Sequence, residues 1–191
     1  VHNTDATINF EYKKKAHDNA FHSFGTYYIF KKRYDGYKNK TLSIATINLL
    51  VPSIFGAIYI SFGANILTKE LSISICAGLG FISICATVIS FILRWQEKVT
   101  ESQKNMIDNY GMYEKYYDIA IDTSLIKEEF EEIYFQLSQE GKYIDRASLE
   151  AEISDKEKRR GHRAALIQLQ RDCVSCNVKP KSMKSSKCNV C

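Results

Sequence analysis

Residues 41–68, TLSIATINLLVPSIFGAIYISFGANILT, and residues 71–93, LSISICAGLGFISICATVISFIL, contain no Asp, Glu, Lys or Arg. Only Lys69 and Glu70 separate the two stretches. A helix needs about 20 apolar residues to cross the hydrocarbon core of a membrane, so each stretch is long enough to be one span. The sequence therefore predicts a two-helix transmembrane hairpin over residues 41–94. The alternative is a buried hairpin of a soluble protein, whose helices are usually shorter and keep a polar face.

Basic residues flank the predicted hairpin on the side of both chain termini. Residues 31–40 include five Lys or Arg, and Arg94 and Lys98 follow the second span. Lys and Arg close to span ends stay on the cytoplasmic side of a membrane. We therefore expect both termini to be cytoplasmic and the short turn to lie outside.

Small and polar residues inside the spans are candidates for helix packing or for lining a pore. They are Asn48, Pro52, Ser53, Ala57, Ser61 and Asn65 in the first span and Ser74 and Gly78 in the second. Small residues let helix backbones approach closely in lipid. Pro52 removes the donor that would pair with the carbonyl of Asn48, which makes this part of the span prone to kinking. Packing inside the hairpin, packing against a neighbouring subunit and a water-filled path all stay open.

The segments before and after the predicted hairpin, residues 1–40 and 95–172, are expected to be helical. Apolar residues in the first segment favour an amphipathic helix that enters the membrane or lies on its inner surface. In the second segment, Gly141 is expected to end one helix. Ser154 and Glu157 have the spacing of a capping box at the start of the last helix. We expect these helices to form a scaffold and an oligomer interface.

The end of the sequence carries the second strong signal. Cys173 and Cys176 form one C-x-x-C pair, and Cys188 and Cys191 form another after 11 intervening residues. Four thiolates in this arrangement fit a tetrahedral Zn²⁺ ion. Disulfides are disfavoured in the cytoplasm, which favours zinc over cystine, although redox-active or disordered thiols are the remaining alternatives. Four thiolates close the coordination sphere, so residues 173–191 are predicted to form a structural zinc knuckle.

Charge is divided unevenly between the segments that follow the hairpin. Residues 94–154 carry a net charge of −7, and residues 155–191 carry +7. The basic tail is expected to pair with acidic protein surface or to bind nucleic acid, whose affinity comes mainly from phosphate neutralisation; a solvated charged face is the third interpretation. The candidate contact residues are Lys156, Lys158, Arg159, Arg160, Arg163, Lys179, Lys181 and Lys184.

The sequence contains no recognisable catalytic pattern. It lacks a phosphate-binding loop, a nucleophile elbow and an H-E-x-x-H motif, and its four histidines are scattered. We therefore expect no enzymatic activity. No ionisable group lies in either predicted span, which argues against a subunit of an ion-coupled transporter.

The predicted architecture resembles the SLATT families of two-span bacterial effectors, which combine an N-terminal helix, a tight hairpin and a long helical region. Residues 130–153 are similar to the helices that follow the membrane in those families. The C-x-x-C-x(11)-C-x-x-C pattern of residues 173–191 resembles a subgroup associated with mobile elements and named for that pattern.

The resemblance implies an effector of anti-phage defence by abortive infection. Such an effector forms a homo-oligomer and breaches the bacterial inner membrane after a partner senses infection. The implied partner is a co-encoded sensor or nucleotide-signal synthase, or a reverse transcriptase with its RNA. The alternative is a membrane anchor whose basic zinc tail recruits a nucleic-acid enzyme. The fold expected from sequence is thus an all-α membrane protein with a two-helix transmembrane hairpin, a cytoplasmic helical region and a small four-cysteine zinc knuckle.

Overall fold

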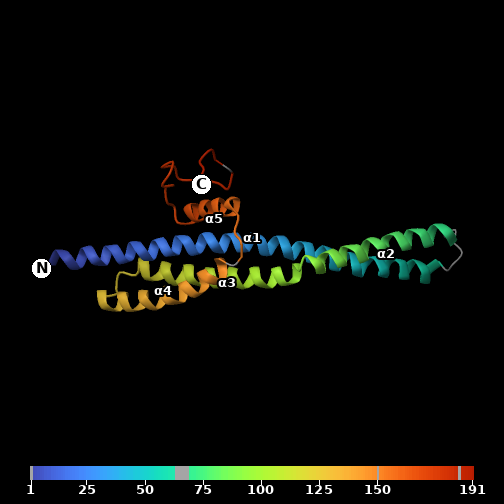
Figure 1. The fold of residues 1–191 in the computed structure, drawn as a ribbon, viewed down its shortest axis with the longest axis horizontal. Helices are drawn as coiled ribbons and strands as arrows, with labels where there is room; N and C mark the ends of the chain where they lie inside the picture. Colours follow the sequence, from blue (N-terminus) through green and yellow to red (C-terminus); the bar gives the residue numbers. More distant parts are fainter. Residues whose placement is uncertain (1, 63–68, 150, 185) are drawn as a thin grey trace. The chain divides into compact units, whose positions relative to one another are not determined.

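The computed structural model describes residues 2–62, 69–149, 151–184 and 186–191 (Figure 1). Over these residues the chain forms five α-helices and no β-strand. The helices are α1 (His2–Phe62), α2 (Lys69–Ile92), α3 (Trp95–Ile121), α4 (Lys127–Leu149) and α5 (Asp155–Gln168). The predicted all-α class is therefore confirmed for the described part of the chain.

The helices are distributed over two compact units. The first contains Val1–Lys32 and Ser102–Cys191, and the second contains Arg33–Glu101. Helix α1 contributes to both units, because it runs from His2 to Phe62 as one helix with Pro52 inside it. The first unit thus combines the beginning of the chain with its last helices.

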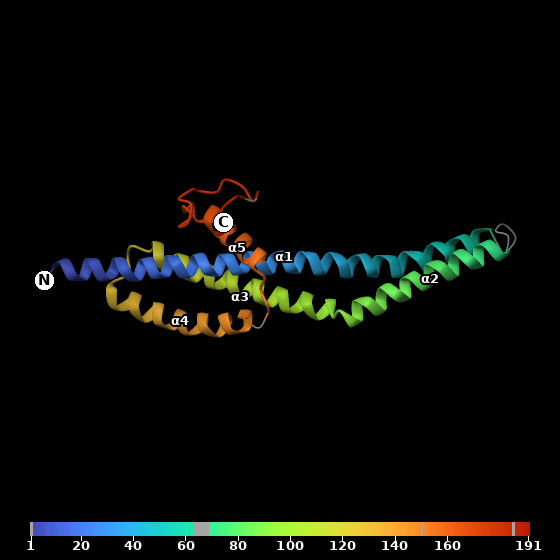
Figure 2. The ribbon, with the colours of Figure 1, turned by 45° about the horizontal axis from the view of Figure 1, so that its top comes forward.

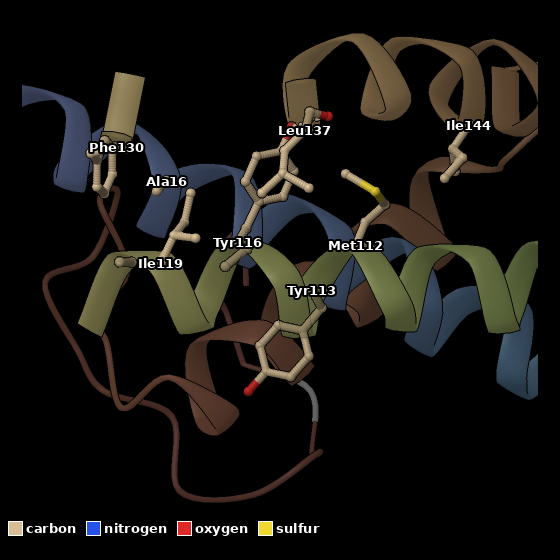
Figure 3. Packing of buried hydrophobic residues seen from close by; sticks show 10 residues of the cluster. Ala16, Met112, Tyr113, Tyr116, Ile119, Phe130, Leu137 and Ile144 are labelled. Atoms are coloured by element: carbon tan, nitrogen blue, oxygen red, sulfur yellow. Dashed lines mark hydrogen bonds between the residues drawn. The ribbon is translucent and has the colours of Figure 1, made fainter. Parts of the chain in front are cut away.

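In the first unit, the beginning of α1 packs with α3 and α4 around an apolar core (Figure 2). The buried members of the core are Ala16, Ala20, Met112, Tyr113, Tyr116, Ile119, Ala120, Phe130, Leu137 and Ile144. Tyr116 of α3 reaches toward Leu137 of α4 (Figure 3) and donates its hydroxyl to the Leu137 carbonyl at 3.0 Å. Burial of the phenol raises the pKa of Tyr116 to about 12. The core therefore contains a polar hydroxyl, but that hydroxyl is hydrogen-bonded.

Gly141 lies inside α4, so the prediction that it ends a helix is wrong. A Cβ atom at this position would lie 2.9 Å from the hydroxyl oxygen of Tyr116 and 3.5 Å from Cε of Met112. The missing side chain lets α4 approach α3 closely. A local rule for helix termini cannot distinguish a glycine needed for packing from one needed for a C-cap.

Aromatic side chains of α1 face the interior of the first unit. Phe30 is 1% exposed and Phe21 is 7% exposed, and the ring of Phe24 lies edge-on to that of Tyr113 at 5.0 Å. These aromatic side chains thus pack within the first unit, and the expectation that this part of α1 enters a membrane or lies on its inner surface stays a prediction. An apolar helix face in a sequence does not reveal what covers that face.

The buried face of α3 also contains polar residues that the sequence pattern did not identify: Ser102, Asn105 and Asn109. Asn109 is 2% exposed. Its side-chain amide donates to the carbonyl of Asn105 at 2.8 Å and to the hydroxyl of Ser148 in α4 at 3.3 Å. These hydrogen bonds satisfy the amide within the packed interface.

In the second unit, the end of α1 and helix α2 lie side by side and run in opposite directions (Figures 1 and 2). The contact between them includes polar side chains. The Asn48 amide donates to the hydroxyl of Thr87 at 3.0 Å, and the hydroxyl of Ser83 donates to the side-chain oxygen of Asn48. The end of α1 and helix α2 are thus two neighbouring antiparallel helices in the region where a hairpin over residues 41–94 is predicted, and residues 63–68 lie outside the described ones. Lys69 and Glu70, which the sequence suggested as the connecting turn, belong to α2.

Large apolar side chains of this hairpin point outward. Leu49 is 69% exposed, Phe81 is 68% exposed and Phe91 is 84% exposed. The described part of the unit thus combines a polar contact at Asn48 with large apolar side chains on its surface.

Helix α2 ends at Ile92, and Arg94, two residues later, adopts a left-handed φ of 53°. Within the described parts of the chain, no single helix has both the length and the apolar composition needed to cross a membrane. The segments Ala77–Ile92 and Trp95–Ile121, which meet at a bend of 47°, are together long and apolar enough to do so. This statement rests on length and composition alone.

Candidate metal centre

The candidate centre is built on α5, which begins with the capping box predicted from the sequence. The Ser154 hydroxyl accepts a hydrogen bond from the backbone N–H of Glu157, and the Glu157 carboxylate accepts one from the backbone N–H of Ser154 at 3.0 Å. Both bonds satisfy N–H groups that have no partner within the helix. The prediction of a helix start at this point is confirmed.

The chain after α5 packs against α1. One buried cluster joins the two segments. It contains Phe21 of α1, Ala165 and Leu166 of α5, and the candidate ligands Cys173 and Cys191. Burial of this apolar surface orders a segment that has little apolar sequence of its own. Sequence reasoning missed Phe21, because no local pattern connects residue 21 with residue 173.

Two arginines connect the tail with the helices. Arg163 of α5 is 9% exposed. Its Nε donates to the carbonyl of Ser182 at 2.7 Å, and its Nη1 donates to the main-chain oxygen of Cys191 at 2.8 Å. Arg171 donates to the carboxylate of Asp18 at 2.8 Å and places its guanidinium 5.3 Å from the ring centroid of Phe21. These contacts hold the tail against α1 and α5 within the first unit.

The four predicted cysteines come together. All four Sγ atoms lie within 4.8 Å of one another. The Sγ atoms of Cys173 and Cys188 are 3.9 Å apart, and those of Cys176 and Cys191 are 3.7 Å apart. A tetrahedral ion with metal–sulfur bonds of about 2.3 Å places its sulfurs about 3.8 Å apart. The predicted clustering is therefore confirmed, and the arrangement could hold one metal ion.

The backbone of each C-x-x-C turn supports this arrangement. In the first turn, the N–H of Asn177 donates to the carbonyl of Cys173 at 2.8 Å, and Asn177 has a left-handed φ of 53°. In the second turn, the N–H of Val190 donates to the sulfur of Cys188 at 3.4 Å. Each turn thus directs its two sulfurs to the same side.

The surroundings affect the two cysteines of the second pair differently. Backbone N–H groups of Cys191 and Val190 lower the pKa of the Cys188 thiol to about 6. Burial raises the pKa of the Cys191 thiol to about 12. The Cys191 sulfur would therefore need a bound cation to stay deprotonated, as metal ligation requires. With four sulfurs as ligands, such an ion has no open position for water or substrate, so the site suits a structural role.

A model of the family described as "Mobilome CxxCx(11)CxxC protein" matches residues 13–191. The chain belongs to this family. The match covers the helices as well as the cysteines, so the helical region is part of what defines the family. No curated protein and no solved structure matches the chain.

Most of the predicted contact residues are exposed. These are Lys156, Lys158, Arg159, Arg160, Lys179, Lys181 and Lys184. Lys158 forms an ion pair with Asp155 at 3.7 Å. Arg163 differs from the others, because it is buried and both of its hydrogen bonds go to the tail. Its side chain stabilises the candidate centre and is not available to a partner.

The predicted pore and packing residues belong to the second unit. Asn48 contacts α2, and the Ser53 hydroxyl donates to the carbonyl of Leu49 at 2.7 Å. Four further residues are exposed: Pro52, Ala57, Ser74 and Gly78. Asn65 lies outside the described residues, as does the side chain of Ser61. The structure therefore brings Asn48 together with α2, and it leaves Ala57 and Gly78 open on the surface.

Proposed function

We propose that this protein is a membrane effector of bacterial anti-phage defence. Its hairpin spans the inner membrane with both termini in the cytoplasm. It forms a homo-oligomer that breaches the membrane when a co-encoded partner signals infection. This role needs no catalytic group in the chain.

The observation that carries the membrane proposal is the inverted polarity of the second unit. Exposed apolar side chains occur on both helices, including Leu49, Ile60 and Phe91. Soluble monomers rarely expose contiguous apolar surface of this extent. Lipid removes the cost of that exposure, and hydrogen bonds such as that between Asn48 and Thr87 then hold the helices together.

Oligomer formation is supported by the small residues that stay exposed on the hairpin. Ala57 of α1 and Gly78 of α2 have no large side chain to keep another helix away, and a Cβ atom at Gly78 would meet no atom within 4 Å. Close backbone approach at small residues is a common basis of helix association in lipid. These positions are therefore our candidates for contacts between subunits.

We further propose that the four cysteines bind Zn²⁺ and that the tail is the docking part of the molecule. Zinc is the ion that closed four-cysteine sites most often hold. The exposed basic residues of α5 and the tail give the partner a positively charged surface. The family description assigns its members to the mobilome. The resemblance to SLATT effectors is our reason for proposing a role in defence.

The proposed function is tested by measuring membrane potential and entry of an impermeant dye in cells that express the protein with its co-encoded partner. We expect depolarisation before growth stops. Ala57→Leu should reduce toxicity, because the larger side chain blocks close helix approach, whereas Thr46→Leu at another exposed position of α1 should not. Cells that die with normal potential and no dye entry would contradict a pore.

The second candidate function is a membrane anchor that recruits a nucleic-acid enzyme or its ribonucleoprotein. The net charge of +7 on residues 155–191 favours this role, and seven of the predicted basic contact residues are exposed. The anchor predicts that the tail retains a co-encoded reverse transcriptase or another nucleic-acid enzyme in the membrane fraction without any change in membrane potential.

A further inference from the structure

Two lysines from different helices meet at one aromatic cluster in the second unit. Lys40 of α1 places its Nζ atom 5.2 Å from the ring centroid of Trp95 and 5.7 Å from that of Tyr37. Lys98 of α3 places its Nζ atom 5.8 Å from the centroid of the same Tyr37 ring. The contacts join segments on either side of the hairpin. We name this group the two-lysine site; it consists of Tyr37, Lys40, Trp95 and Lys98.

Among the described residues, the two lysines of this site have no acidic partner at ion-pair distance. Arg94 differs, since it is paired with Glu97. An aromatic face attracts an ammonium group but leaves its charge in place. Two ammonium groups beside one ring repel each other unless an anion lies between them.

The position of the site indicates which anion it receives. Lys40 comes directly before the first uncharged stretch, and Trp95 follows the second. Exposed apolar side chains begin at once next to the site, with Leu42 of α1 60% exposed and Leu93, between α2 and α3, 43% exposed. Trp and Tyr side chains are typical of the boundary between membrane and water. Lysines at that depth meet the phosphate groups of lipids.

We propose that Lys40 and Lys98 together bind the phosphate of an anionic phospholipid headgroup, while Tyr37 and Trp95 contact the headgroup beside it. This inference rests on the proposed membrane location of the hairpin. An anionic lipid is favoured over phosphatidylcholine because the choline group of the latter carries a compensating positive charge. The bound lipid joins α1 to the start of α3 where the hairpin leaves the membrane.

Trp95 is the only tryptophan of the chain, so its fluorescence reports on this site alone. The full chain is placed in vesicles that contain equal amounts of phosphatidylglycerol and phosphatidylcholine. Bromine atoms, which quench tryptophan on contact, are carried by the acyl chains of one lipid or the other. We expect phosphatidylglycerol to contact Trp95 with a preference of about 25-fold, because each of the two lysines contributes about fivefold at an anionic surface.

The double variant Lys40→Gln, Lys98→Gln should lower this preference to about one, while brominated phosphatidylcholine still quenches Trp95 and so reports normal insertion. Lys38→Gln is the matched control. Lys38 is exposed and lies over the ring of Tyr34 at 5.4 Å, so its replacement removes a nearby charge outside the two-lysine site. The control should keep the preference.

The outcomes separate the site from the proposed function. Equal quenching by the two brominated lipids in the unmodified protein would overturn the lipid site and leave membrane insertion intact. An equal loss of preference in Lys38→Gln would show diffuse surface attraction and would also overturn the site. Loss of the preference on addition of inorganic phosphate would identify free phosphate as the ligand. Absence of quenching by either lipid would overturn the membrane location itself.

Discussion

Gly25 of α1 and Gly161 of α5 bring two helix backbones into direct contact. A Cβ atom on Gly161 would lie 2.5 Å from the carbonyl oxygen of Gly25 and 2.9 Å from side-chain atoms of Ile29. A Cβ atom on Gly25 would lie 3.4 Å from the nearest atoms of Gly161. The close approach therefore depends mainly on Gly161, and it positions the helix that leads into the four cysteines.

Gly161→Ala should loosen α5 from α1, because the new methyl group meets a backbone atom that cannot move aside cheaply. We expect a loss of about 1–3 kcal/mol in the free energy of unfolding, as for other overpacked positions. Thermal unfolding of the full chain in detergent, followed by circular dichroism, measures this loss. Gly111→Ala in α3 is the control, since a Cβ atom there meets nothing within 4 Å, and it should gain up to about 1 kcal/mol from helix propensity. Equal melting temperatures for the two variants would contradict the packing argument.

Cys173→Ser should abolish metal binding and unfold the tail. The purified protein is expected to contain about one zinc per chain, as four-thiolate sites hold a single ion. The variant should contain none and become sensitive to protease after α5, while it still enters the membrane, because insertion depends on the hairpin. Cys85→Ser, at a half-buried cysteine of α2 outside the cluster, should keep its zinc. Metal analysis and membrane fractionation decide between these results. A fully metal-free wild type with four freely alkylated thiols would reject the zinc site.

Arg163→Gln should weaken the metal centre without removing a ligand. The change removes two charge-assisted hydrogen bonds to the main chain of the tail. A hydrogen bond to a charged group contributes about 1.5–3 kcal/mol, so release of zinc to a chelator should be at least about tenfold faster. Arg160→Gln removes the same charge from an exposed position of α5 and should release zinc at the wild-type rate. Equal release rates from both variants would show that Arg163 does not support the centre.

Asn48→Leu should destabilise the hairpin rather than change the permeability of a pore. The substitution removes the hydrogen bonds to Thr87 and Ser83, a loss of about 1 kcal/mol in a membrane. The amount of protein in the membrane fraction should fall, whereas Thr46→Leu on an exposed part of α1 should leave it unchanged. A normal protein level combined with lower conductance would instead place Asn48 in the wall of the pore.

The sequence by itself determined the features that depend on neighbouring residues. The capping box at Ser154 and Glu157 follows from hydrogen bonds within one helical turn. The uncharged stretches predicted long helices because their composition and length favour them. The four cysteines could be grouped from their spacing, since each C-x-x-C turn brings two sulfurs together and one ion needs both turns.

Only the tertiary structure decided which residues those helices contact. Gly141 was predicted to end a helix but serves a close approach to Tyr116, and Arg163 was predicted to contact a partner but bonds to the tail. The sequence leaves both a pore and a brace open for Asn48, and only the structure supplies its partner in α2, Thr87. The physical reason is the same in each case. Helix propensity, capping and metal-ligand spacing act over a few residues, whereas the partner of a buried side chain is set by distant segments that the fold brings together.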